Sequence, residues 1–268
     1  MKLNEIIKEL EAVEITGSAA VELTGINFDS RKVTSGDLFV AIRGSGFDGH
    51  EYIPQAIKGG AVAVVSEEDP LEDFQGITWV KTSRPREALA LMASAFFGHP
   101  SRDLHLVGIT GTNGKTTIAT LLHQIHTDLG FKAGLLSTIQ VLIGKEEFPA
   151  SHTTPDPLQL NAYLRKMVDL GCGYCFMEVS SHAIDQDRIC GLHFNGGVFT
   201  NLTHDHLDYH KDFKTYLNVK KRFFDELPAD SYALVNMDDK NGQVMLQNCK
   251  ARKHTYSLRS GGEFRGRI

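Results

Sequence analysis

The stretch LHLVGITGTNGKTTIATLLHQIHTDLG, residues 104–130, decides the fold of the second half of the chain. An apolar strand-like run leads into a turn with two glycines, and a helical pattern follows that ends at Gly130, as a helix cap should. Gly111 and Gly114 allow backbone N–H groups to turn toward an anion, and the N-terminal end of a helix attracts negative charge. The stretch therefore predicts a phosphate-binding strand–loop–helix unit.

The spelling of this loop departs from the usual G-x-x-x-x-G-K-[ST] pattern. The position five before Gly114 is Ile109, so the loop is the shorter G-x-x-G-K-T. On this interpretation Lys115 reaches the β- and γ-phosphates of a nucleotide, and the hydroxyl of Thr116 holds Mg²⁺. The alternative is a glycine turn with an incidental lysine, but strand, loop and helix occur in the order that a phosphate site requires.

Composition narrows the class of protein. The net charge of −5 predicts neither a nucleic-acid partner nor a membrane-surface partner. The longest uncharged apolar stretch, AGLLSTIQVLIG (133–144), is too short for a membrane-spanning helix, and the N-terminus lacks the apolar core of a signal peptide. Four cysteines do not make a disulfide framework, and the C-x-x-C pair Cys172 and Cys175 is predicted to lie in the core. We expect a cytoplasmic protein.

The chain divides into two predicted α/β units. Residues 1–98 contain strand candidates at 23–29, 38–42, 61–65 and 77–83 and helix candidates at 50–60 and 85–98. Residues 99–103, HPSRD, are the predicted linker. From 104 to 268 strand and helix patterns alternate, which predicts a P-loop domain with a doubly wound, mostly parallel sheet. Residues 261–268 read as the start of a strand, so we expect this domain to be incomplete.

The stretch FMEVSSHAIDQDR, residues 176–188, carries the next candidate residues. Glu178 ends an apolar strand, where an ionised carboxylate needs a partner such as a metal ion. The alternative is a strand-end glutamate in solvent. Ser180, His182, Gln186 and Arg188 follow with a spacing that suits a polar ligand.

The stretch TNLTHDHLDYH, residues 200–210, is rich in metal-ligand residue types. His204, His206 and Asp208 fit the H-x-H-x-D-H pattern of a zinc hydrolase. The sixth position is Tyr209, and His210 comes one place late. A surface loop with capping residues is the second alternative.

Lys220 lies in a predicted helix in which Val219 and Phe223 mark the buried stripe. A lysine on a helix is normally solvated, so its spacing alone gives it no special role.

Four motifs in this order resemble the Mur ligase family. GTNGKTT (111–117) resembles the shortened P-loop of that family, and residues 28–53 resemble its N-terminal UDP-binding domain. EVSSHAIDQDR (178–188), and TNLTHDHLDYH with the lysine that follows it, resemble the members that add a diamino acid.

The resemblance implies roles for residues at matching positions. It implies ATP binding by Gly111, Thr112, Asn113, Gly114, Lys115, Thr116 and Thr117. It implies uridine diphosphate contacts by Phe28, Ser30, Ser45, Gly46 and Phe47, and muramoyl-peptide contacts by Thr153, Thr154, Ser180, Gln186 and Arg188. Two Mg²⁺ ions are implied, with Thr116, Glu178, His206 and Lys220 as ligands, Lys220 being carbamylated. The implied catalytic residues are Lys115, Glu178, His206 and Lys220.

The implied activity is ATP-dependent amide ligation through an acyl phosphate. A diamino acid, meso-diaminopimelate or L-lysine, is added to UDP-N-acetylmuramoyl-L-alanyl-D-glutamate in cytoplasmic peptidoglycan precursor synthesis, by a monomer. Because the family has a third, C-terminal domain, we expect this chain to bind the UDP substrate without ligating it.

Other hypotheses stay open at this point. Another Mur-type ligase, including one that adds D-alanyl-D-alanine, would share the P-loop. A folylpolyglutamate synthetase should begin near its P-loop, so the leading 98 residues count against it. A zinc hydrolase would bind zinc and ignore ATP, and a non-enzymatic P-loop module would need neither Glu178 nor Lys220.

Overall fold

The computed structural model describes residues 1–268 except 45, 71–75, 151, 204–206, 260 and 267–268, and of residues 207 and 208 only the backbone. The chain divides into two compact units, Met1–Gly98 and His99–Ile268. Both are α/β, and the prediction of the fold class is confirmed. In the described part of the chain, no helix is both long enough and apolar enough to cross a membrane.

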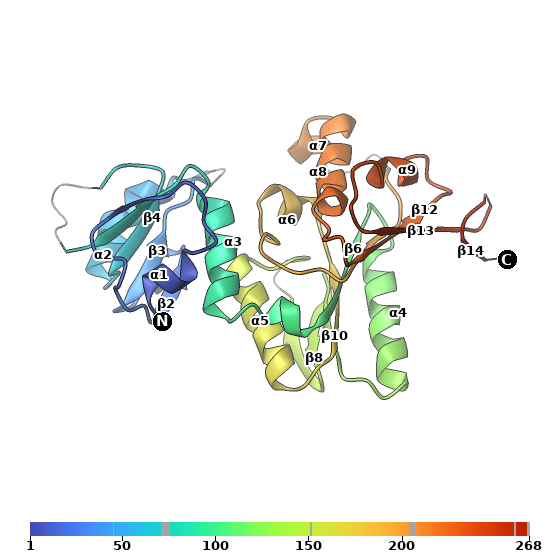
Figure 1. Ribbon diagram of the computed structural model, residues 1–268, viewed down its shortest axis with the longest axis horizontal. Coiled ribbons are helices and arrows are strands. Elements are labelled where there is room, and N and C mark those ends of the chain that lie inside the picture. Colours follow the sequence, from blue (N-terminus) through green and yellow to red (C-terminus); the bar gives the residue numbers. More distant parts are fainter. Residues whose placement is uncertain (45, 71–75, 151, 204–206, 260, 267–268) are drawn as a thin grey trace. The chain divides into compact units, whose positions relative to one another are not determined.

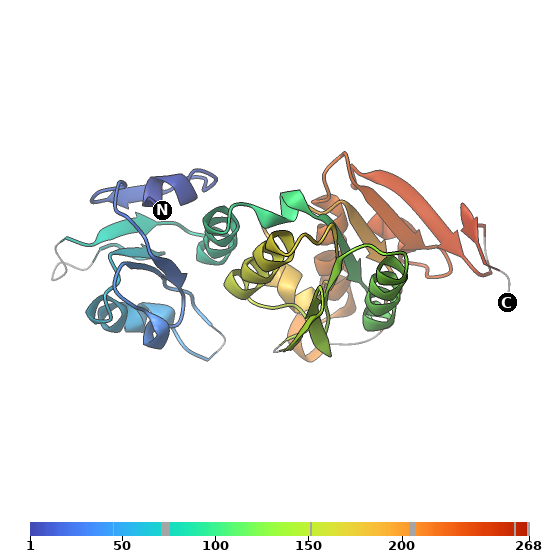
Figure 2. The ribbon, with the colours of Figure 1, turned by 90° about the horizontal axis from the view of Figure 1, so that it is seen from below.

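Unit 1 is built on a five-stranded sheet in the order β1-β5-β4-β3-β2, in which only β1 runs antiparallel to its neighbour. The strands are Glu14–Thr16 (β1), Gly25–Asn27 (β2), Asp37–Val40 (β3), Ala63–Ser66 (β4) and Thr78–Lys81 (β5). The helices are Leu3–Ile6 (α1), Ser30–Lys32 (η1), Gly49–Tyr52 (η2), Ile53–Lys58 (α2) and Pro85–Phe96 (α3). Figure 2 shows α1 and α2 on opposite faces of the sheet.

Burial of both faces explains the continuous apolar runs in unit 1. Every residue of β3 and β4 is buried. Phe39 and Val64 pack with Ile53 and Ala56 of α2. A strand covered on both faces needs no polar alternation, which is why these strands read as unbroken apolar stretches.

Unit 2 has a nine-stranded sheet in the order β14-β13-β12-β11-β6-β10-β7-β8-β9. The strands are His105–Thr110 (β6), Ala133–Leu136 (β7), Gln140–Ile143 (β8), Glu146–Pro149 (β9), Tyr174–Glu178 (β10), Gly196–Phe199 (β11), Tyr232–Asn236 (β12), Arg252–Ser257 (β13) and Phe264–Arg265 (β14). The helices are Pro100–Asp103 (η3), Lys115–Asp128 (α4), Pro157–Asp169 (α5), Ser181–Asp185 (α6), Leu207–His210 (α7), Phe213–Asp225 (α8) and Gly242–Met245 (α9).

Helices cover both faces of this sheet. Figure 1 shows α4 on one face and α5, α6 and α8 on the other. Along β10 the side chains alternate: Phe176 packs toward α4, whereas Cys175 and Met177 belong to the core on the opposite side. Cys172 and Cys175 are both buried.

Two parts of unit 2 differ from the simple strand–helix alternation. The sheet is parallel from β14 to β7, but β8 and β9 add an antiparallel hairpin at one edge. Residues 99–103, expected to form a linker, include the short helix η3. Pro100 and Ser101 are buried there, and the Ser101 hydroxyl accepts a hydrogen bond from the backbone N–H of His193. These residues therefore pack as part of unit 2.

Candidate active site

The candidate site lies where parallel strands of unit 2 end. The strands β6, β10 and β11 are neighbours, and they end at Thr110, Glu178 and Phe199. Loops that follow the carboxyl ends of adjacent parallel strands meet at one edge of the sheet, which is the usual position of a ligand site in such folds.

The glycine-rich loop between β6 and α4 is held against the end of β11. The backbone N–H of Thr112 donates to the Asn201 carbonyl (2.8 Å), and that of Asn113 donates to the Asn201 side-chain oxygen (3.0 Å). The Thr200 hydroxyl donates to the Asn113 carbonyl at 2.6 Å. Gly111 has φ +148°, and a Cβ atom there would collide with the Thr200 hydroxyl. Only glycine lets the loop approach β11 this closely.

Two lysine side chains converge on this loop. Lys115 Nζ donates to the carbonyl oxygens of Gly111 (3.0 Å) and Thr112 (2.8 Å). Lys220, on α8, is 1% exposed, and its Nζ also donates to the Gly111 carbonyl (3.0 Å). The same nitrogen lies 3.3 Å from the Thr110 hydroxyl and 4.9 Å from the centre of the Tyr216 ring. The expectation that a helix lysine is solvated therefore fails for Lys220.

Glu178 is buried at the end of β10, 1% exposed, and is hydrogen-bonded to two neighbouring elements. Its Oε1 atom accepts from the Thr116 hydroxyl and from the backbone N–H of Thr138, both at 2.8 Å. It is therefore not a strand-end glutamate in solvent.

The pair Thr116 and Glu178 fits a magnesium ion. Two ligands at right angles in an octahedral Mg²⁺ shell, each about 2.0–2.1 Å from the ion, are about 2.9 Å apart. The 2.8 Å separation of Thr116 Oγ1 and Glu178 Oε1 matches one edge of that octahedron. The oxygen donors are also of the type that this hard cation prefers.

A second polar group adjoins Glu178. The Thr154 hydroxyl donates to the Glu178 carbonyl (2.8 Å), and the backbone N–H of Ser180 donates to that hydroxyl (3.1 Å). Arg188 donates to the Thr154 carbonyl (2.9 Å) and, through Nη2, to the Gln186 side-chain oxygen (2.7 Å). Arg188 is thereby fixed beside the end of β10.

These residues line one cavity of about 480 Å³. The predicted site residues along it are Thr112, Asn113, Gly114, Lys115, Thr116, Thr153, Thr154, Glu178, Ser180, Arg188 and Lys220. His182, a candidate from the same motif as Ser180, lines the cavity as well. Sequence reasoning missed three further lining residues, Thr138, His152 and Ser181, although His152 adjoins the predicted Thr153 and Ser181 lies inside a quoted motif. Gly111 and Gln186 contact the lining residues, and Thr117 is exposed on the first turn of α4.

Unit 1 has its own cavity, of about 530 Å³. Phe28, Ser30 and Phe47, predicted from the sequence, line it. Tyr52 and Gln55 line it as well and were not predicted. The Ser30 hydroxyl donates to the Gln55 side-chain oxygen at 3.1 Å. Gly46 is not among the lining residues.

Some predicted residues fall outside the described part of the chain. These are Ser45, His204 and His206, so the second-metal ligand set and the zinc-hydrolase pattern have no description here. Of that segment, His210 is described: it is 3% exposed, with its ring 5.2 Å from the Tyr216 ring.

The fold and the site define a two-unit α/β protein with a strand–loop–helix motif of the P-loop class. Comparison with known families identifies the family within this class. The Mur ligase middle domain matches residues 109–267, and the Mur ligase family catalytic domain matches residues 22–97. The chain belongs to the Mur ligase family.

The similar proteins carry a more specific name. UDP-N-acetylmuramoyl-L-alanyl-D-glutamate–2,6-diaminopimelate ligases are 53% identical in Bacteroides fragilis and 56% identical in Parabacteroides distasonis, over the whole of this chain. The chain spans about 55% of the length of these curated relatives. A solved structure of a ligase with this name superposes with a TM-score of 0.82 at 26% identity, over 99% of this chain and 54% of that one.

Proposed function

We propose that this chain supplies the nucleotide-substrate unit and the ATP-binding unit of a ligase that adds diaminopimelate to UDP-N-acetylmuramoyl-L-alanyl-D-glutamate. The names of the relatives favour diaminopimelate over L-lysine as the added residue. A cytoplasmic location and a monomeric state are parts of the same proposal.

One observation carries the proposal: phosphate-binding and carboxylate-binding groups line the same cavity. The glycine-rich loop with Lys115 forms one part of the lining, and Arg188 with Ser180 forms another. A guanidinium and a hydroxyl suit a carboxylate, as in a peptide substrate. In ligation through an acyl phosphate, a substrate carboxylate attacks the γ-phosphate of ATP, so both must occupy one cavity. An amine then displaces phosphate through a tetrahedral intermediate.

The loop and its lysine would bind and orient the triphosphate. Backbone N–H groups of the loop and the N-terminal end of α4 favour phosphate oxygens, and Lys115 would exchange its carbonyl partners for them. Thr116 and Glu178 would hold a Mg²⁺ ion, which supplies neutralisation of phosphate charge when bound. Holding two anions in contact in this way is the main source of catalysis expected for phosphoryl transfer.

Carbamylation of Lys220 is part of the proposal. The ammonium groups of Lys115 and Lys220 both donate to the Gly111 carbonyl oxygen, each at 3.0 Å. The two positive charges are therefore close together and repel each other. Reaction of the Lys220 amine with CO₂ forms an N–C bond, releases a proton and leaves an anionic carbamate. Repulsion between the side chains then becomes attraction, and α8 presents a carboxylate-like group to the cavity.

Titration calorimetry on the 268-residue chain tests this function. We expect one molecule of UDP-N-acetylmuramoyl-L-alanyl-D-glutamate and one of Mg–ATP to bind per chain. Lys115→Ala should weaken Mg–ATP binding by at least about tenfold, because the loop loses its only cationic side chain. Thr127→Ala, on the last turn of α4, is the matched control. No binding of the muramoyl dipeptide at millimolar concentration would refute the proposal.

A further inference from the structure

Unit 1 contains a buried histidine outside the residues considered so far. His50, in η2, is 7% exposed. In the sequence it lies between Phe47 and Tyr52, two aromatic residues that line the cavity of unit 1. Phe47 is 61% exposed and Tyr52 is 42% exposed. Phe28, which follows β2, is 38% exposed and lines the same cavity.

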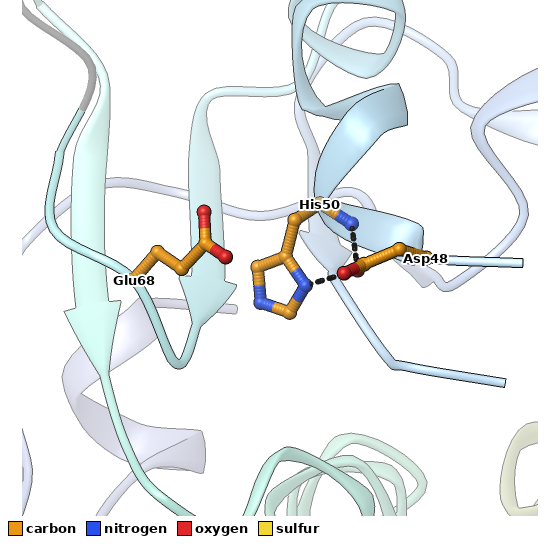
Figure 3. Close-up of side chains that lie close together, drawn as sticks. All are labelled: Asp48, His50 and Glu68. Atoms are coloured by element: carbon orange, nitrogen blue, oxygen red, sulfur yellow. Dashed lines mark hydrogen bonds and ion pairs between the residues drawn. The ribbon is translucent and has the colours of Figure 1, made fainter.

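Asp48, His50 and Glu68 also form a candidate metal cluster, with ligand atoms within 4.8 Å of one another (Figure 3). The hydrogen bonds argue against a metal. The backbone N–H of Glu67 donates to His50 Nε2 at 3.3 Å, so Nε2 carries the lone pair. The proton is then on Nδ1, which faces Asp48 Oδ1 at 2.6 Å. Both ring nitrogens are engaged, and the dashed lines of Figure 3 join His50 to Asp48.

Both carboxylates of the cluster form ion pairs with Arg43. Its guanidinium contacts Asp48 Oδ2 (3.0 Å), Glu67 Oε2 (3.1 Å) and Glu68 Oε1 (2.6 Å). The backbone N–H and the side chain of His50, followed by Arg43, lower the pKa of Asp48 to about 2. The network therefore joins Arg43 and Asp48 to the segment that follows β4.

The turn that Gly44 and Phe47 close presents the Phe47 ring. The backbone N–H of Gly44 donates to the Phe47 carbonyl at 2.8 Å, and the Phe47 ring lies 2.7 Å from the position a Gly44 Cβ would take. At the far end of the turn, Gly49 passes so close to Ile42 that a Cβ would lie 2.6 Å from its backbone atoms. The turn is thus closed at both ends, and Asp48 is the residue through which His50 holds it.

We propose that His50 is a positioning residue of the unit 1 cavity, which acts through Asp48 and Arg43 to hold Phe47 and Tyr52 as walls for the planar base of a nucleoside diphosphate. Aromatic faces beside a cavity stack on a planar heterocycle, and a wall held in place loses little conformational entropy on binding. This inference rests on the proposed binding of a UDP-linked substrate by unit 1.

The test is a titration of the 268-residue chain with UDP. His50→Phe fills the same space without either hydrogen bond, and it should weaken UDP binding at least about tenfold. His50→Asn keeps a donor to Asp48 and should stay within about threefold of the parent chain. Lys81→Met, which breaks the exposed ion pair with Asp69, is the control and should change nothing.

A second readout does not depend on the ligand. Hydrogen exchange at the Gly44 amide should accelerate in His50→Phe and recover in His50→Asn, because that amide closes the turn. If His50→Phe does not fold, Arg43→Gln serves instead: its side chain is half exposed, and it should weaken UDP binding about threefold to tenfold.

The outcomes distinguish the role of His50 from the binding of a nucleotide by unit 1. Unchanged UDP affinity and unchanged Gly44 exchange in the variants would overturn the role of His50 alone. Absence of UDP binding by the parent chain would overturn the nucleotide assignment of unit 1, and the role of His50 with it. Stoichiometric Zn²⁺ bound by the parent chain and lost in His50→Phe would show a metal site in place of the positioning network.

Discussion

Replacement of Gly111 by alanine tests how closely the phosphate loop approaches β11. Gly111 has φ +148°, a conformation that costs an alanine about 1–3 kcal/mol. Its new Cβ would also push aside the Thr200 hydroxyl and break the hydrogen bond to the Asn113 carbonyl, which contributes about 1 kcal/mol. Alanine also lowers the conformational entropy of the unfolded chain, which offsets about 0.4–1 kcal/mol of this destabilisation. We expect a net loss of about 2 kcal/mol.

Gly130 provides the matched control. It also has a positive φ, +86°, but no atom lies within 4 Å of the position of its Cβ. Gly130→Ala should therefore cost only backbone strain, about 1 kcal/mol. The lower entropy of the unfolded chain offsets part of that cost, as it does for Gly111→Ala. In a domain of this size 1 kcal/mol corresponds to about 2–4 °C, so Gly111→Ala should lower the Tm of unit 2 by about 4–8 °C and Gly130→Ala by at most about 3 °C.

Calorimetry measures the two Tm values, and the fluorescence of Trp79, the only tryptophan, reports separately on unit 1. Unit 1 should unfold at the same temperature in both variants. Combining Gly111→Ala with Thr200→Ala should destabilise by less than the sum of the single variants, because the collision disappears. Equal Tm values for Gly111→Ala and Gly130→Ala, with equal affinity for Mg–ATP, would refute the close approach to Thr200.

Three further predictions concern the charged groups. Glu178→Gln keeps an acceptor for Thr116 but loses the negative charge that would hold Mg²⁺. The increase in ATP affinity that Mg²⁺ causes should be at least about tenfold smaller in this variant than in the parent chain. Titrations with ATP in the presence and absence of Mg²⁺ measure that increase. In ¹³C-bicarbonate the chain should give a carbamate NMR signal that Lys220→Met abolishes and the neighbouring Lys221→Met retains; a signal that survives Lys220→Met would exclude this lysine. The Asp48 carboxyl should titrate near pH 2 by NMR. Because its pKa lies below the ordinary 3.8, its stabilising contribution is complete above that pH and is lost as the pH falls toward 2.

The sequence predicted the helices, strands and phosphate loop better than it predicted which strands lie next to each other in the sheet. Alternating strand and helix patterns correctly indicated a mostly parallel sheet, and the glycines placed the phosphate loop. The order of strands could not be read from the chain, since β10 is inserted between β6 and β7. That insertion is what brings Glu178 beside Thr116, 62 positions earlier in the chain.

The missed residues have a common physical reason. Thr138 contributes a backbone N–H to Glu178, and a backbone group leaves no trace in residue type. Tyr52 lines the cavity of unit 1 from the end of η2, a position that its residue type does not indicate. Lys220 was marked only by the resemblance to the family, because helix periodicity measures apolar character. The loop carbonyl that receives its ammonium group belongs to a distant strand end.

The short phosphate loop is explained by what lies beside it. A loop with two residues fewer between its glycines has fewer backbone groups to fix its own shape. Asn201 supplies what is missing: its carbonyl receives one loop N–H, and its side chain both receives another and donates to the Asn113 carbonyl at 3.1 Å. Thr200 adds a fourth contact from the same strand end. The first residues of the segment that resembled a zinc site therefore stabilise the phosphate loop, and the loop conformation proposed to bind nucleotide is fixed by a strand end 90 residues away in sequence.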